Sequence, residues 1–284
     1  MKDIDIRRAL TPTLLAGLLA GTAFTAVTGH AAMRSRAATP SIIVDSKTFA
    51  VTLPRTISAG MVALSLTGAG QPWTGVSLGR LKTGATHSAI VNALKKGDSA
   101  RLETLGVPYG GVLPAAMIMV NLPAGEYVAF DMEQQGPKSP VQYASTFFTV
   151  GPASGPTRAA PSALATIRMD DMRFKVPASL PAGWDTIRMA NPDQVDHMAV
   201  TAKIAKGKTY KDVLAYIKKG NNSGPGPLDP TTFGGIGTMG PGQTAYLTQS
   251  FSPGEYVILC FVEDPKKGGM PHAAEGMVNH FMVR

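Results

Sequence analysis

The strongest constraint on the fold of this chain is an internal repeat. Residues 57–97 align without a gap with residues 180–220, 123 positions further on, and an Ala-Gly pair, a Gln, a Gly-x-Thr motif and a closing Lys-Lys-Gly recur in place. Further along, PAGEYVAFD (123–131) matches SPGEYVILC (252–260). A repeat of this length indicates that one structural unit is used twice. We therefore interpret the chain as a tandem duplication.

The composition between the repeats suggests where the two units divide. The stretch GPASGPTRAAPSA (151–163) is rich in Gly, Pro and Ser, which is typical of a linker. We expect a first domain at 40–150 and a second at 164–284, each of ordinary domain size.

Residues 1–31 have the composition of a secretory signal peptide. A basic start precedes a short apolar stretch that ends in small residues, and Gly29 and Ala31 suggest cleavage after Ala31. The pair Arg7 and Arg8 leaves twin-arginine export open beside the general route. An uncleaved membrane anchor is the rival interpretation, but the apolar part falls short of the ~20 residues that a membrane span needs. We expect a periplasmic or secreted protein with no integral membrane span in its mature form.

Both halves of the repeat favour short strands over long helices. The chain has 31 Gly and 22 Pro, is only 7% aromatic and 16% charged, and contains alternating segments bounded by Pro-Gly or Ala-Gly turns. Such strand-like segments occur at 165–169, 186–189 and 245–249. One helix per half is expected at 86–97 and 209–220, the second with Thr209 as N-cap and Asp212 three residues on. We predict an all-β protein of two β-sandwiches, each with one inserted helix.

The Gly-rich stretch GGIGTMGPG (234–242) is expected to be a loop. It leads into a strand and not into a helix N-terminus, so it lacks the context of a phosphate-binding loop. The net charge of +8 is spread along the chain without Arg-rich runs or interleaved aromatics, which argues against nucleic acid as a partner.

Cys260 is the single cysteine of the chain, so it cannot form a disulfide within it. It is buried and inert, paired with another chain, or a ligand. It stands at the end of an apolar run. After eleven intervening residues the following loop contains His272, and then Met277.

This arrangement resembles the cupredoxins, the blue-copper family of plastocyanin and azurin. The pattern G-x-Y-x-x-x-C is present as Gly254, Tyr256 and Cys260, and an H-x4-M spacing follows as His272 and Met277. The resemblance implies a Greek-key β-sandwich in each half. It also implies an early His ligand, which by position is His197.

The implied metal ligands are therefore His197, Cys260, His272 and Met277, for one type 1 copper per chain. A thiolate, two imidazoles and a weak thioether form a donor set that suits copper in both oxidation states. The first half acts as an internal control, because Thr74 and Asp131 stand at the positions of the first His and the Cys. We expect no metal ligands there.

Three functional classes follow from the resemblance. A copper enzyme would need a second copper centre, commonly connected to the first through a His next to the Cys ligand. Here Leu259 and Phe261 flank Cys260. We therefore expect no enzyme activity, no catalytic residues and no organic cofactor. An electron carrier fits better. Its candidate redox partner is an acidic protein, since Lys266 and Lys267 lie in the ligand loop. The alternative is a metal-free secreted β-sandwich that serves as a binding or interaction module.

Overall fold

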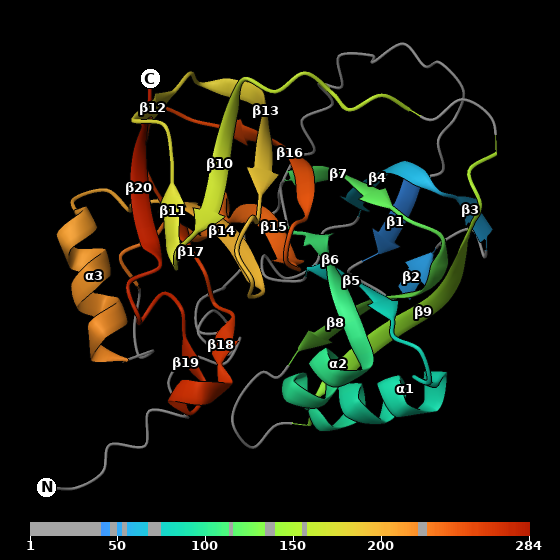
Figure 1. Cartoon of the computed structure of the whole chain (residues 1–284). Helices are drawn as coiled ribbons and strands as arrows, with labels where there is room; N and C mark the ends of the chain where they lie inside the picture. The colour runs from blue at the N-terminus through green and yellow to red at the C-terminus, as the bar shows by residue number, and fades with distance from the viewer. Residues whose placement is uncertain are drawn as a thin grey trace, which may run out of the picture.

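The computed structural model of the chain describes residues 41–45, 50–52, 56–67, 75–113, 116–133, 140–154, 158–220 and 226–284 (Figure 1). The expected signal segment and Thr74 lie outside these residues. None of the helices in the described part has the length and apolar character that crossing a bilayer requires.

The first half is built from nine strands and two helices within its described residues. The strands are β1 (Ser41–Asp45), β2 (Ala50–Thr52), β3 (Thr56–Ser58), β4 (Gly60–Thr67), β5 (Val76–Leu81), β6 (Gly106–Val112), β7 (Ala116–Leu122), β8 (Gly125–Glu133) and β9 (Gln142–Gly151). The helices are α1 (His87–Lys96) and α2 (Ser99–Leu105).

The second half follows the same plan and adds a small hairpin. Its strands are β10 (Ala165–Asp170), β11 (Arg173–Lys175), β12 (Ser179–Leu180), β13 (Gly183–Ala190), β14 (His197–Lys203), β15 (Gly234–Met239), β16 (Thr244–Phe251), β17 (Gly254–Leu259), β18 (Glu263–Asp264), β19 (Met270–Pro271) and β20 (Val278–Val283). Its helix is α3 (Tyr210–Lys219). The segments expected to be strands at 165–169, 186–189 and 245–249 all lie within strands.

Strand pairing is the same in both halves. In the first, β4 pairs with β1 and β7 in one sheet, while β5 pairs with β6 and β8, and β9 with β8 and β3, in the other. In the second, β13 pairs with β10 and β16, β14 with β15 and β17, and β20 with β17 and β12. Each half is thus a sandwich of two sheets, and the chain crosses repeatedly from one sheet to the other. The expected all-β fold class is confirmed.

The two sheets continue from one half into the other. One has the order β11-β10-β13-β16-β7-β4-β1-β2, and the other the order β12-β20-β17-β14-β15-β6-β5-β8-β9-β3. The junctions are the antiparallel pairs β16–β7 and β15–β6, and Figure 1 shows the halves side by side along them. Each junction satisfies backbone groups that a free edge strand would leave unpaired. The domain boundary at 151–163 stays a prediction, as does the duplication.

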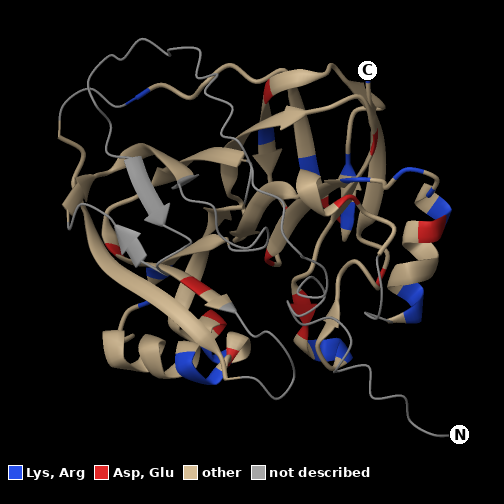
Figure 2. Cartoon of the chain, turned by 180° about the vertical axis from the view of Figure 1, so that it is seen from behind, with Lys and Arg blue, Asp and Glu red and all other residues tan. Residues whose placement is uncertain are grey.

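The core lies between the two sheets and is continuous through both halves. Its largest buried side chains include Tyr127 and Leu78 from the first half and Tyr256, Phe251 and Phe281 from the second. Alternation along each strand places these apolar residues on the inner face. Figure 2 shows acidic and basic residues interspersed over both halves.

The helices begin and end where their capping residues predict. The Thr209 hydroxyl accepts the N–H of Asp212, the Asp212 carboxylate accepts the N–H of Thr209, and Gly220 ends α3 in the left-handed conformation. In α1 the Thr86 hydroxyl accepts the N–H of Ala89, and Gly97 ends the helix in the left-handed conformation. The first half has a further helix, α2, that the sequence analysis did not include. Its N-cap is Asp98, whose carboxylate accepts the N–H of Arg101.

The expectation of a loop at 234–242 is wrong for its first six residues, which form β15. β15 lies between β14 and β6, where the backbones approach closely. A Cβ at Gly237 would lie 3.0 Å from the Cα of Gly111 on β6, and a Cβ at Gly235 would lie 2.0 Å from the carbonyl oxygen of Ala199 on β14. The glycines are therefore needed for close packing of a strand.

Candidate metal centre

The three strongest candidate ligands come from three different segments that meet at one end of the second sandwich. His197 begins β14 and Cys260 follows β17, two strands that pair antiparallel with Val200 opposite Leu259. Because side chains alternate along β17, Cys260 shares the inner face with Tyr256 and Ile258. Leu259 points the other way, into the cluster beneath α3.

His272 reaches the same place although eleven residues separate it from Cys260. Those residues fold back on themselves as the hairpin β18–β19, in which Glu263 lies opposite Pro271. The N–H of His272 donates to the carbonyl of Val262 at 2.9 Å, and the N–H of Ala273 donates to the carbonyl of Cys260 at 2.7 Å. The long loop is thus closed at its base, and its length does not separate the two residues.

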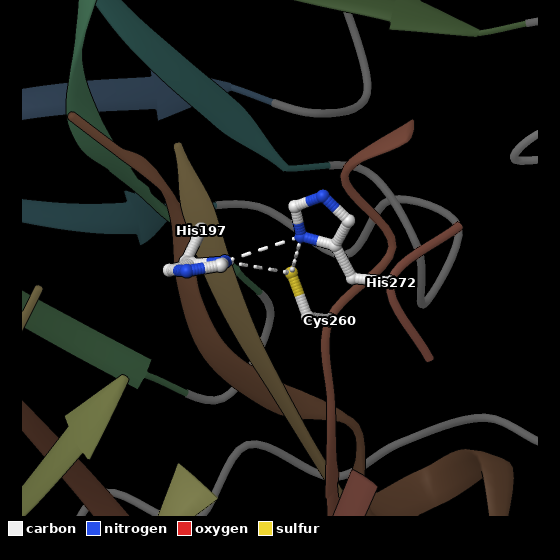
Figure 3. A group of neighbouring side chains, drawn as sticks. All are labelled: His197, Cys260 and His272. Atoms are coloured by element: carbon white, nitrogen blue, oxygen red, sulfur yellow. Dashed lines mark hydrogen bonds between the residues drawn. The ribbon is translucent and has the colours of Figure 1, made fainter. Parts of the chain in front are cut away.

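The three side chains converge on one point (Figure 3). The Cys260 Sγ lies 3.5 Å from Nδ1 of His272 and 3.9 Å from Nδ1 of His197, and the two Nδ1 atoms are 3.1 Å apart. Cys260 and His197 are fully buried and His272 is 4% exposed. Among the described residues, this is the group of His, Cys, Asp and Glu side chains close enough to hold a metal ion.

These separations fit three donors around a common ion. With metal–nitrogen bonds of about 2.0 Å and a metal–sulfur bond of about 2.3 Å, ligand atoms in a trigonal arrangement lie roughly 3.5 to 3.7 Å apart. A soft sulfur with two imidazoles is a donor set that copper favours. The residues present therefore fit the metal that the sequence suggests.

Met277 is tied to this group through its backbone. Its N–H donates to the carbonyl of His272 at 2.8 Å, and its carbonyl accepts the N–H of Cys260 at 3.3 Å. Its side chain is fully buried and belongs to the same core cluster as Cys260. Three of the four sequence candidates are thus held in one network of backbone hydrogen bonds.

Burial controls the protonation of the candidate ligands. Burial raises the pKa of the Cys260 thiol to about 12, although N–H groups of Met198 and Val262 act in the opposite direction. Burial, and then the neighbouring His197, lower the pKa of His272. The site accordingly presents a neutral imidazole, ready to bind a metal, and a thiol whose proton a metal must displace.

One partner of the site was missed by the sequence analysis. Asp193 Oδ2 lies 3.1 Å from Nε2 of His197, the ring nitrogen that faces away from Cys260. The sequence signal for this pair is the Asp-x-x-x-His spacing within DQVDH.

The charges of the ligand loop are mixed. Lys267 forms an ion pair with Glu275, and Glu263 and Asp264 belong to the same loop. Lys266 is exposed, and its N–H donates to the Asp264 carboxylate at 2.8 Å. The positive edge expected from the two lysines is therefore partly neutralised.

The first half carries a different residue at the position of the cysteine. Asp131 lies on β8, opposite Ala144 of β9, and is buried. Its neighbourhood does not form a second group of metal-binding side chains in the described part of the chain.

Comparison with known proteins gives matches among solved structures. Neither a protein-family model nor a curated protein matches the chain. A dithionite-reduced auracyanin from Roseiflexus castenholzii is 24% identical, with a TM-score of 0.30, over 44% of this chain and 99% of that chain. Auracyanin A, a "blue" copper protein from Chloroflexus aurantiacus, is 18% identical, with a TM-score of 0.26, over 43% and 98%. The Cu(I) form of an amicyanin mutant is 17% identical, with a TM-score of 0.25, over 44% and 86%.

Each of these matches spans less than half of this chain. The strand order of each half, and the placing of His197, Cys260 and His272 at one end of the second sandwich, are what the resemblance to cupredoxins implied. The chain has a cupredoxin-like fold.

Proposed function

We propose that the second half binds one type 1 copper ion through His197, Cys260 and His272, with Met277 as a weak axial ligand. The observation that carries the proposal is the convergence of one sulfur and two Nδ1 atoms, all within 4 Å of one another, in a buried site. Bound copper would supply a one-electron couple between Cu(I) and Cu(II).

We infer that the protein is an electron carrier. The residues of the site support this role by rigidity, since hydrogen bonds tie the backbones of Cys260, His272 and Met277 together. A fixed ligand set changes little between oxidation states, which favours electron exchange. Leu259 and Phe261, which flank Cys260, offer no imidazole for a second copper centre. We therefore propose that the protein is not an enzyme.

We propose that the carrier works in the periplasm or outside the cell, after removal of residues 1–31. Its proposed partner is a redox protein. The Lys266 side of the ligand loop suits an acidic protein, while Glu263, Asp264 and Glu275 limit the positive charge there.

A visible absorption spectrum after addition of Cu(II) tests the metal site. We expect an intense blue or green colour from sulfur-to-copper charge transfer, lost in Cys260→Ser because only the sulfur supplies the donor orbital. His272→Ala should alter the colour by opening the site to water. Asp131→Ala, at the matching position of the first half, is the control and should leave the spectrum unchanged. Colourless protein that retains no stoichiometric copper after dialysis would instead support the metal-free binding module.

A further inference from the structure

Asp193 lies on the opposite side of His197 from Cys260. We propose that Asp193 is a positioning residue, which holds the proton on Nε2 of His197, directs Nδ1 at the metal and, as an anion, lowers the reduction potential of the site. This inference rests on the proposed copper function and adds a tuning group to it.

The two nitrogens of the His197 ring have different partners. Nδ1 lies 3.1 Å from Nδ1 of His272 and 3.9 Å from the Cys260 sulfur, while Nε2 lies 3.1 Å from Oδ2 of Asp193. An ionised carboxylate only accepts hydrogen bonds, so the ring proton resides on Nε2. The lone pair of Nδ1 is then free to bind a metal.

Asp193 is itself held in place on both of its carboxylate oxygens. Oδ1 accepts the N–H of Gln194 at 2.7 Å, and Oδ2 accepts the N–H of Met172 at 3.4 Å. Met172 and Asp171 form the turn between β10 and β11, and both have a φ of 54°. Two successive non-glycine residues rarely adopt this left-handed conformation, which costs energy that surrounding contacts must offset. The strained turn directs the Met172 N–H at Asp193.

The loop that carries Asp193 is anchored in the protein interior by Asn191. Asn191 is fully buried, and its Oδ1 accepts the N–H of Asp193 at 3.1 Å. Its amide group donates to the carbonyls of Val195 at 2.9 Å, Met239 at 2.9 Å and Gly240 at 3.1 Å. A fully satisfied buried amide fixes the geometry of the loop. The folded loop therefore holds the Asp193 carboxylate against His197, and Asp193 does not behave as a mobile surface side chain.

The negative charge favours the oxidised state of the metal. A carboxylate on the second ring nitrogen makes an imidazole a more basic ligand, and a more basic ligand stabilises Cu(II) over Cu(I). The His197 side chain is wholly buried and the Asp193 side chain only 21% exposed, so water screens their interaction weakly. The expected direction is therefore a lower reduction potential with Asp193 than without it.

The test compares reduction potentials of the full chain loaded with copper. Asp193→Asn should raise the potential and weaken Cu(II) binding by roughly 10- to 100-fold, the usual range for such outer partners. The absorption band should persist because the ligands are unchanged. Asp196→Asn is the matched control. Asp196 directly precedes His197 in the chain, whereas the described carboxylate bonded to the His197 ring is that of Asp193. The shift in Asp196→Asn should be clearly smaller.

A second measurement needs no metal. In nitrogen NMR spectra of the copper-free protein, the His197 ring should carry its proton on Nε2, and Asp193→Ala should abolish this preference while near-ultraviolet circular dichroism confirms the fold. An unchanged potential in Asp193→Asn, a shift equal to that of Asp196→Asn, or a proton on Nδ1 in the wild type would overturn the role of Asp193 while copper binding stands. Wild-type protein that binds no copper would overturn the proposed function, and with it the tuning role.

Discussion

Ile118 of β7 lies directly opposite Leu247 of β16 at the junction of the two halves. The two residues occupy matching positions, because the match between 123–131 and 252–260 places Leu247 as the counterpart of Ile118. The other junction has the same property: Val112 in Tyr-Gly-Gly-Val pairs with Ile236 in Phe-Gly-Gly-Ile. Each strand thus pairs with its own counterpart, as in a twofold interface of a dimer.

Because the two halves are joined by these strand pairs, we expect them to unfold together. Leu247 is fully buried in a core cluster that includes residues of both halves, so Leu247→Ala should cost about 2–5 kcal/mol of unfolding free energy. Calorimetry should show one transition, shifted as a whole. Ser250→Ala, at an exposed position of the same strand, should have little effect. Two separate transitions, with only one of them shifted, would contradict the shared core.

Copper binding should strengthen as the pH rises. The pKa of Cys260 is raised by burial to about 12, so the thiol is protonated throughout the neutral range and must lose its proton to the metal. With one proton released, the apparent affinity should increase about tenfold per pH unit between roughly pH 7 and 9. Competition titrations with a chelator of known pH dependence measure this slope. An affinity that is flat with pH would mean that the thiolate is not a ligand.

Met277→Leu should raise the reduction potential if Met277 is the proposed axial ligand, because a thioether donor favours Cu(II). Its side chain is wholly buried beside the site, whereas Met282 is 36% exposed on β20. Met282→Leu is therefore the control that changes the same atoms without reaching the metal. Voltammetry of both copper-loaded variants measures the difference, and equal potentials would remove Met277 from the ligand set.

Asp185 should make stability fall as the pH rises above the usual pKa of an aspartate. Its Oδ2 is buried and has no hydrogen-bond partner among the described residues, and burial raises the pKa of its carboxyl. The folded state then binds the proton more tightly than the unfolded state, so stability is lost as the group ionises. Asp185→Asn should stabilise the protein at pH 7, with a smaller gain near pH 4. Urea unfolding at both values checks the sign, and a larger gain at pH 4 would contradict it.

Export should leave a mature chain that starts close to residue 32. The order of basic, apolar and small residues in 1–31 is the basis for this expectation. N-terminal sequencing of protein from the native compartment decides it, and a chain that still begins at Met1 would refute it.

Local chemistry accounts for the parts of the structure that the sequence predicted well. Thr209 with Asp212 predicted the start of α3, and Gly220 its end, because capping is a contact between near neighbours in the chain. Alternating side chains predicted β10, β13 and β16. The order Cys260, His272, Met277 named three candidate ligands, and the resemblance to cupredoxins added His197 by its position after an early strand.

Contacts between distant segments decided the rest. Composition favoured a loop at 234–242, yet close packing against Gly111 and Ala199 makes its first part the strand β15. The approach of His272 to Cys260 required the hairpin β18–β19, and the pairing of Asp193 with His197 required a loop anchored by Asn191. The sequence by itself determined the strands with alternating side chains, the caps of α1 and α3, and the kinds of donor atom. The tertiary structure alone decided their distances, burial and partners, because these depend on which backbone edges and side chains meet after the sheets have formed.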